Sequence, residues 1–335
     1  MSCADISVII VNYRSAAFTD ACLRSIYSSN AADCEVIVVD NASYDGCGEM
    51  MQANFPQAVF LQSTRNLGFA GANNLGASVA HGDYLLYLNP DTEVGTEAIE
   101  RLKACLKSTP DAGLAGARLI NSNGTLQTTS VTAFPTIANQ ILGADYLQRK
   151  FPGASLWGMQ ALYSGQRAPS VVDAVSGACV MAKRTVIERV RGFTTDYFMY
   201  GEDLDLCLKV RQMGRKVYHV PESVVVHHGG RSSDARPESN YAAIMIRESM
   251  VHFMTISRGW WYARAFCAAS TVLAGVRMAV LTPLLPLAMP PFGRRGVVRS
   301  WKKWASILAW SFGLQTWTRR EQAAPRGPAA TVGKS

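Results

Sequence analysis

The sequence lacks the motifs that identify several large classes of nucleotide-binding protein. No G-x-G-x-x-G follows the first predicted strand, and no G-x-x-x-x-G-K-[ST] occurs anywhere in the 335 residues. Both motifs depend on glycine backbone that approaches phosphate groups closely. The chain is therefore neither a standard dinucleotide-binding dehydrogenase nor a P-loop enzyme.

Cysteine pairs and charged residues are also scarce. The eight cysteines include no C-x-x-C pair, and a chain of this length can bury a core without disulfides, so we expect buried free thiols in a reducing compartment. Charged residues make up 17% of the chain, below the usual value of about a quarter, and hydrophobic residues make up 48%, which excludes a disordered chain. The opening MSCADISVIIVN has no basic stretch and only a short apolar run, which predicts a buried strand and not a signal peptide.

Strand and helix patterns alternate over the first 120 residues. Apolar runs of strand length occur at 6–11, 35–40, 58–62, 84–88 and 113–119, and helical spacing occurs at 15–28, 45–54, 70–80 and 96–107. Buried strands separated by helices predict βαβ units and a mostly parallel sheet with helices on both faces. After a loosely patterned stretch at 121–170, the sequence predicts a strand at 171–183, a helix at 202–213 and short strands at 216–220 and 223–226.

Polar groups follow four of the predicted strands in succession. They are Asn12, then Asp40-Asn41-Ala42-Ser43, then Arg65-Asn66-Leu67-Gly68, then Asn89-Pro90-Asp91. A turn explains any one of these groups. Ligands of such sheets bind at the carboxyl ends of the strands, so four groups at one edge indicate a binding site.

These motifs, together with SGAC, FMYGEDLDLC and HHGGRS further along, resemble those of family 2 glycosyltransferases, most nearly the bacterial rhamnosyltransferase-like branch. The resemblance runs from about Ile6 to Ser232. It implies an α/β GT-A fold with a catalytic domain at 1–257, divided into a nucleotide-binding half at about 1–120 and an acceptor half at about 121–257. We expect a membrane-associating helical segment at 258–320 and a disordered tail at 321–335.

The resemblance also implies which residues bind the donor: Val11, Asn12, Asp40, Asn41, Arg65, Gly68, Asn73 and Asn89. In this family the end of the first strand and the aspartate after the second hold the base and ribose, and a carboxylate suits the imide N–H of uracil or thymine. Arg65 would contact the diphosphate, and Gly68 would let the backbone approach the ligand.

The family binds a divalent metal through a D-x-D motif, which here reads Asn89-Pro90-Asp91 and so lacks its first carboxylate. The resemblance implies that Asp91 coordinates Mg²⁺ or Mn²⁺ on the donor diphosphate, since hard cations take oxygen ligands. His227, which begins H-x-x-G-x-S, matches a histidine that completes the metal shell in some family members, and an imidazole suits Mn²⁺ better than Mg²⁺.

Glu202-Asp203 matches the acidic pair that supplies the catalytic base of the family. Both acids begin a predicted helix, where the helix dipole favours negative charge. A carboxylate kept ionised there can accept a proton at neutral pH. We expect Asp203 to be the base and Glu202 to be its nearest rival.

The resemblance implies an inverting transferase that moves a sugar from a nucleotide sugar to a lipid-linked or other surface-glycan acceptor, as in O-antigen assembly. It suggests dTDP-L-rhamnose as the donor and leaves hexose and galactofuranose donors open. Two alternatives stay open: a nucleotidyltransferase on a related sheet, and a non-catalytic protein that binds glycan or membrane. A nucleotidyltransferase usually has a glycine-rich basic loop after the first strand, and Asn12-Tyr13-Arg14 is not one.

Positive charge is concentrated near the C-terminus. From Arg258 onward there are 12 basic residues and one acid, a net charge of +11, whereas the first 257 residues carry 21 basic and 24 acidic residues, a net charge of −3. The basic residues lie among apolar ones, which favours an anionic membrane over nucleic acid as the partner. We expect a peripheral cytoplasmic protein at the inner face of the bacterial cell membrane.

The uncharged runs in this segment are short for a membrane span. They number 12 residues between Arg264 and Arg277 and 16 between Arg277 and Arg294, against the roughly 20 that a span needs. We therefore expect interfacial helices with tryptophans at headgroup level, although a single tilted span through Arg277 stays open. These tryptophans are Trp260, Trp261, Trp301, Trp304 and Trp310.

Overall fold

A computed structural model describes residues 5–30, 33–143, 145–197, 199–229, 241–287 and 294–314. The predicted tail at 321–335 and the end of the H-x-x-G-x-S motif lie outside these residues. The strands are β1 (Ile6–Asn12), β2 (Glu35–Asp40), β3 (Val59–Gln62), β4 (Tyr84–Leu88), β5 (Thr92–Val94), β6 (Ala112–Ile120), β7 (Val131–Thr132), β8 (Ser170–Val172), β9 (Ala174–Val175), β10 (Cys179–Lys183) and β11 (Lys216–His227).

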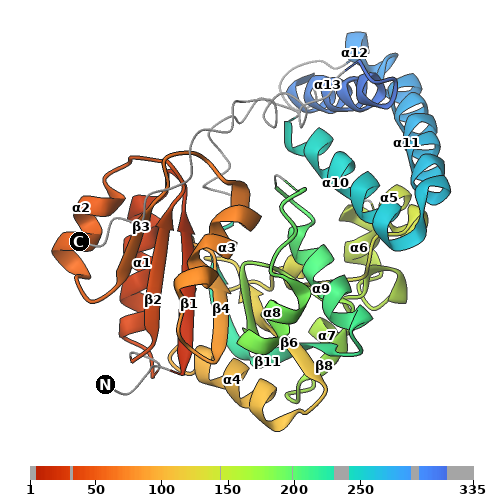
Figure 1. The fold of residues 1–335 in the computed structure, drawn as a ribbon. Helices are drawn as coiled ribbons and strands as arrows, with labels where there is room; N and C mark the ends of the chain where they lie inside the picture. Colours follow the sequence, from red (N-terminus) through yellow and green to blue (C-terminus); the bar gives the residue numbers. More distant parts are fainter. Residues whose placement is uncertain are drawn as a thin grey trace.

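The helices cover the sheet and continue beyond it (Figure 1). They are α1 (Ala16–Tyr27), α2 (Cys47–Asn54), α3 (Gly68–Val79), α4 (Ala98–Ser108), α5 (Ile137–Ile141), α6 (Asp145–Lys150), α7 (Gln160–Tyr163), α8 (Arg184–Val190), α9 (Glu202–Gln212), α10 (Tyr241–Arg258), α11 (Trp260–Leu281), α12 (Leu284–Leu287) and α13 (Arg294–Ser311).

One nine-stranded sheet organises the fold, in the order β3-β2-β1-β4-β10-β6-β11-β5 with β8 paired to β11. The strands β1 to β4 pair in parallel, and so do β6 and β11. β10, β5 and β8 run the opposite way. Because six of these nine strands share one direction, their carboxyl ends meet at one edge of the sheet.

The predicted strands and helices of the first 120 residues are all present, and β2 has the predicted bounds. Two expectations further along are wrong, and one strand within the first 120 residues was missed. The single strand predicted at 171–183 is three strands, because the chain bends at Asp173 between β8 and β9, and Ser176-Gly177-Ala178 forms a turn before β10. The two short strands after residue 216 are one strand, β11, with a register shift between Val220 and Val224. β5 was not predicted, since three residues are too few to show a periodic pattern.

Alternate residues of the buried strands pack against helices on opposite faces of the sheet, as the pleat requires. Val8 and Ile10 of β1 join a cluster with residues of α1, α2 and α4. Ile9 and Val11 join a second cluster with residues of α3, α8 and α9. Burial on both faces explains why these strands read as continuous apolar runs.

The C-terminal helices α10, α11 and α13 pack on one another as a helical layer that extends away from the sheet, beyond α9 and α5 (Figure 1). Met250 and Met254 of α10 pack on Ala263 and Phe266 of α11. On its other side α11 exposes Val272, which is 67% exposed, and also Val276 and Val280. We call these three valines, at helical spacing, the valine stripe. α11 has the length and mean hydropathy of a membrane span, and only 17% of its apolar window is buried, which is weak support for a span.

The seven cysteines that the structure describes are free thiols, and five of them are buried. This confirms the expectation of free cysteines for that part of the chain. The buried ones are Cys22, Cys47, Cys105, Cys179 and Cys207.

Candidate active site

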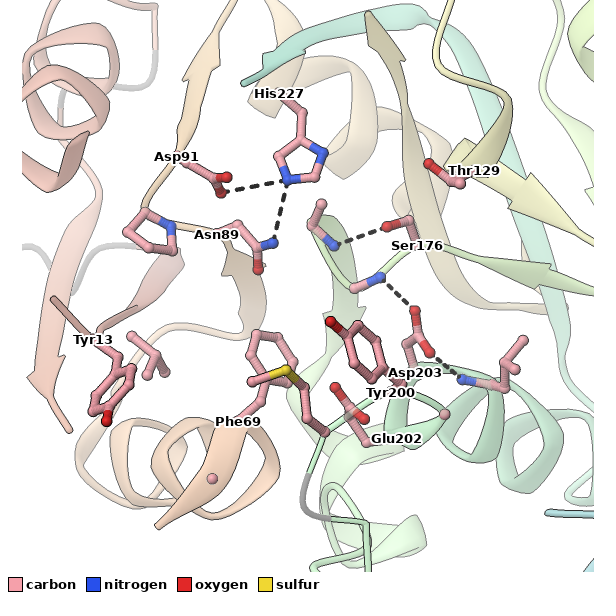
Figure 2. A pocket seen from close by; sticks show the side chains of 18 of the residues that line it. Tyr13, Phe69, Asn89, Asp91, Thr129, Ser176, Tyr200, Glu202, Asp203 and His227 are labelled. Atoms are coloured by element: carbon pink, nitrogen blue, oxygen red, sulfur yellow. Dashed lines mark hydrogen bonds and ion pairs between the residues drawn. The ribbon is translucent and has the colours of Figure 1, made fainter. Parts of the chain in front are cut away.

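A cavity of about 460 Å³ opens at the carboxyl edge of the sheet. One wall carries Asn89 and Asp91, which follow β4, and His227, which ends β11; the facing wall carries Glu202 and Asp203 at the start of α9 (Figure 2). Residues more than 110 positions apart in sequence, such as Asp91 and Glu202, therefore line one space.

The pairing of β5 with β11 brings Asp91 to His227. Thr92 lies opposite His227 in this ladder, and the His228 N–H donates to the Asp91 carbonyl at 2.9 Å. The Nε2 atom of His227 lies 3.4 Å from Oδ1 of Asp91 and 3.5 Å from Nδ2 of Asn89. Because β5 was not predicted, the sequence also did not show that strand pairing brings the two predicted metal ligands together.

Gln127 fixes the orientation and the tautomer of His227. Its Nε2 donates to Oδ1 of Asn121 at 3.0 Å and to the His227 carbonyl at 3.3 Å, so its Oε1 is the acceptor, 2.7 Å from Nδ1 of His227. Nδ1 therefore carries the proton, and the lone pair of Nε2 faces Asp91 and Asn89. A partner on the far ring nitrogen is the usual support of a metal-binding histidine.

The donor set on this wall fits a divalent cation. The Oδ1 atoms of Asn89 and Asp91 are buried and accept no hydrogen bond from the residues described. Buried acceptors of this kind need a partner, and a cation would supply one. Within the described part of the chain no three His, Cys, Asp or Glu side chains form a metal-binding group, so the candidate set is one carboxylate, one amide and one imidazole.

The acidic pair on the facing wall has two different environments. Oδ2 of Asp203 accepts from the Gly177 N–H at 3.1 Å, and Oδ1 accepts from the Leu204 N–H at 2.8 Å. Burial raises the pKa of Asp203, and these hydrogen bonds oppose that rise. Oε2 of Glu202 is buried and has no hydrogen-bond partner among the described residues, and burial and the neighbouring Asp203 raise the pKa of Glu202 to about 8. Backbone N–H groups therefore hold both carboxylate oxygens of Asp203.

Gly177 lets Asp203 take this position. A Cβ at residue 177 would lie 3.3 Å from Cβ of Asp203 and 3.6 Å from the ring of Phe69. A Cβ there would therefore press mildly on Cβ of Asp203, the residue whose carboxylate accepts from the Gly177 N–H. The SGAC motif therefore has a role in the site that the sequence did not reveal.

Asn12 and Asp40 do not line the cavity, although both were predicted to bind the donor. Asn12 Nδ2 donates to Asp40 at 2.8 Å, and Asp40 also accepts from Ser43 and from Nε2 of Gln62 at 2.6 Å. Burial would raise the pKa of Asp40, but the hydrogen bonds from Ser43, Gln62 and Asn12 lower it. Both residues lie in a buried network behind the loop that follows β2.

Of the other predicted donor residues, Val11, Asn41 and Gly68 line the cavity. Asn41 holds the turn before α3, because its Oδ1 accepts from the Leu67 N–H at 2.7 Å and its Nδ2 donates to the Gly68 carbonyl at 3.2 Å. Gly68 has a φ of +70°, which favours glycine.

Arg65 and Asn73 lie outside the cavity lining. Arg65 is exposed. Asn73 is buried and donates to the Phe69 carbonyl at 3.0 Å within α3. The structure therefore does not bring these two predicted donor residues to the cavity.

Several cavity residues had no signal in the sequence. Tyr200 has a φ of +69°, rare for a residue with a side chain, and Gly201 after it has a φ of +101°. Such conformations cluster at functional sites. Met250 comes from α10, so the C-terminal helical layer contributes to the cavity wall. For Tyr200, the one sign in the sequence of a role in the site is its position two residues before Glu202.

The family model for glycosyl transferase family 2 matches residues 7–189. The chain belongs to this family. It is therefore a glycosyltransferase that uses a nucleotide-sugar donor, which excludes the nucleotidyltransferase and non-catalytic alternatives. The match ends before the acidic pair, so the roles of Glu202 and Asp203 stand on the geometry above.

Two relatives and one solved structure illustrate the range of similar glycosyltransferases. N-acetylglucosaminyl-diphospho-decaprenol L-rhamnosyltransferase of Mycobacterium tuberculosis is 26% identical over 271 residues, covering 76% of this chain and 86% of that protein. The low-salt glycan biosynthesis hexosyltransferase Agl10 of Haloferax volcanii is 27% identical over 244 residues, covering 71% of each. The mannosyltransferase PcManGT of Pyrobaculum calidifontis, solved with GDP-Man and Mn²⁺, has a TM-score of 0.54 at 17% identity and covers 92% of this chain and 86% of that one. This likeness shows the GT-A fold.

Proposed function

We propose that this glycosyltransferase inverts the anomeric centre in a single displacement, with Asp203 as the general base. The observation that carries the proposal is the arrangement across the cavity: a carboxyl group held by two backbone N–H groups on one wall and a candidate cation-binding donor set on the other. A donor diphosphate held at the second wall places the anomeric carbon between the two.

Asp203 takes the proton of an acceptor hydroxyl as the hydroxyl oxygen attacks the anomeric carbon. The bond from that carbon to the diphosphate breaks on the opposite face, and the nucleoside diphosphate leaves with the electron pair. The N–H groups of Gly177 and Leu204 fix the Asp203 carboxylate on a rigid helix start, which general base catalysis requires. Protonated Glu202 stays beside it without competing for the proton.

Asp91, His227 and Asn89 would hold a divalent cation, and the imidazole favours Mn²⁺ over Mg²⁺. When bound, the metal would stabilise the negative charge of the departing diphosphate. Gln127 supports this role by keeping the lone pair of His227 Nε2 toward Asp91.

On the donor side we propose that Val11, Asn41 and Gly68 contact the nucleotide sugar directly, because they line the cavity. Asn12 and Asp40 would not contact the donor and would act indirectly, by holding the loop after β2 in position. The exposed Arg65 would reach the diphosphate only as the donor enters, and Asn73 would stabilise α3.

The relatives support a sugar donor class without fixing the sugar. One is named for rhamnosyl transfer to a diphospho-decaprenol-linked acceptor and another for hexosyl transfer. We propose L-rhamnose from dTDP-L-rhamnose as the donor and a polyprenyl-diphosphate-linked glycan as the acceptor. A panel of nucleotide sugars, read by nucleoside diphosphate release, tests this choice; release from a hexose donor alone would reject rhamnose.

We propose that the catalytic domain spans 1–257 and that 258–320 holds it at the cytoplasmic face of the membrane. The valine stripe of α11 supports this, since one face of the helix packs on the protein and the other presents apolar side chains. Trp261 is 80% exposed on the same helix, as expected for a residue at headgroup level. A helix packed along one side fits a bilayer surface better than a span.

A further inference from the structure

Three cationic side chains from three helices meet at one aromatic ring. The guanidinium of Arg247 on α10 lies 5.6 Å from the centroid of Trp304 on α13, and that of Arg277 on α11 lies 5.7 Å from it. The ammonium group of Lys303 lies 6.0 Å from the same centroid. We call Arg247, Arg277 and Trp304 the basic cluster.

The two arginines of the basic cluster have no carboxylate partner among the described residues. One Nη of Arg247 donates to the Ala243 carbonyl at 2.9 Å, but its Nε is buried and has no acceptor within the part of the chain that the structure describes. Burial lowers the pKa of Arg247 to about 10, which leaves it charged at neutral pH. A buried donor without an acceptor is costly, and an anion would remove that cost.

The basic cluster connects the catalytic cavity to the exposed apolar face of α11. Arg247 precedes the cavity residue Met250 by three positions on α10, so the two side chains lie on one face of that helix. Arg277 precedes Val280 of the valine stripe by three positions on α11, so these two side chains are neighbours on that helix. A molecule that touches the stripe and reaches the cavity would pass these cations.

We propose that the basic cluster binds a phosphate group carried by a lipid. Guanidinium groups recognise phosphate oxygens through paired, charge-assisted hydrogen bonds. The valine stripe beside the cluster provides the apolar surface for the lipid. The phosphate belongs either to the diphosphate of a lipid-linked acceptor, an identification that rests on the proposed function, or to the headgroup of an anionic phospholipid.

The test measures binding to the full chain in two arms, without sugar transfer. In the first, inorganic pyrophosphate is titrated by calorimetry in excess chelator. In the second, the protein is sedimented with phosphatidylcholine vesicles with and without phosphatidylglycerol. The variants are Arg247→Gln and Arg277→Gln. The matched control is Arg264→Gln. Arg264 also lies over a tryptophan ring, that of Trp260 on α11, but it is 13 residues, or about 20 Å, from Arg277 along the helix.

We expect binding to weaken about tenfold or more in both cluster variants and to change little in Arg264→Gln. Loss in the pyrophosphate arm, with Asp91→Ala binding normally, identifies the diphosphate as the ligand. Loss only in the phosphatidylglycerol arm identifies the headgroup. Equal binding by all variants, equal loss in Arg264→Gln, or no binding in either arm overturns the proposal. If Arg247→Gln unfolds, the exposed Arg277 decides the result.

This outcome is separable from that of the proposed function. A donor panel without any nucleoside diphosphate release would reject the proposed transfer and leave the binding result intact. Conversely, active transfer with unchanged binding in both cluster variants would reject the basic cluster alone.

Discussion

Replacing Glu202 by Gln tests the division of roles within the acidic pair. Glu202 is 7% exposed, its Oε2 has no partner, and its pKa is raised to about 8 by burial and by Asp203. Glutamine has the shape of the protonated acid and does not titrate. The substitution therefore removes the ionisation and keeps the packing.

The sign of the effect follows from the direction of the pKa change. A carboxyl whose pKa is higher in the folded state than in the unfolded chain binds a proton more tightly when folded. Its contribution to stability is full below its unfolded pKa and is lost as the pH rises through the folded value. Between pH 4.5 and about 8 the loss amounts to about 3–5 kcal/mol, at about 1.4 kcal/mol for each tenfold change in proton affinity.

Urea unfolding at pH 5, 7 and 8.5 measures this loss. We expect wild-type stability to fall relative to Glu202→Gln as the pH rises, with unchanged m-values. Glu188→Gln, at an exposed position of α8, is the matched control and should follow the wild type. Parallel curves for wild type and Glu202→Gln would show that Glu202 is already ionised in this range and that the reasoning is wrong.

Further predictions concern the base, the metal wall and the membrane face. Asp203→Asn should leave donor binding near normal and slow transfer by about 10²–10⁴-fold, whereas Glu202→Gln should remain active. If instead Glu202→Gln is inactive and Asp203→Asn transfers sugar at the wild-type rate, Glu202 is the base. Asp91→Ala should abolish metal-dependent transfer, and full activity of the wild type in excess chelator would refute the metal assignment. Gln127→Leu should raise the Mn²⁺ concentration needed for half-maximal activity, as should His227→Ala; an unchanged metal titration for Gln127→Leu would reject its role. Val276→Asp should release the protein from anionic vesicles without lowering its unfolding midpoint, since the residue is 56% exposed.

Most strands of the first 120 residues were predictable because β1, β2, β4 and β6 are largely buried on both faces. Ile6 to Asn12 are all buried, so β1 is apolar apart from Ser7 and Asn12, and the polar residues that follow the predicted strands mark the ligand-binding edge. Asp203 was predicted because FMYGEDLDLC resembles the family motif that contains the acidic pair, and His227 because HHGGRS resembles the motif that contains the histidine.

Other site residues depend on contacts that no local pattern encodes. Gln127 reaches His227 across 100 positions, and Gly177 reaches Asp203 across 26. Asp40 shows the opposite case, because its position after a strand suggested ligand contact while its neighbours Ser43 and Gln62 occupy its oxygens. Whether a polar side chain faces the ligand or its own loop is decided by those neighbours and not by its place in the sequence.

The presence of Met250 in the cavity wall has a consequence for the length of the glycan on which the enzyme acts. Met250 also packs on α11, so the cavity lies at a fixed height above any surface on which the valine stripe rests. A hydroxyl on the first sugars of a membrane-anchored acceptor lies within that height, whereas the far end of a long glycan extends past it. The enzyme would then transfer sugar faster to short acceptor glycans than to long ones, and transfer would stop once the end of the glycan lies beyond the cavity. On vesicles, kcat/KM should therefore fall as the acceptor saccharide is lengthened, and should fall less for acceptors free in solution.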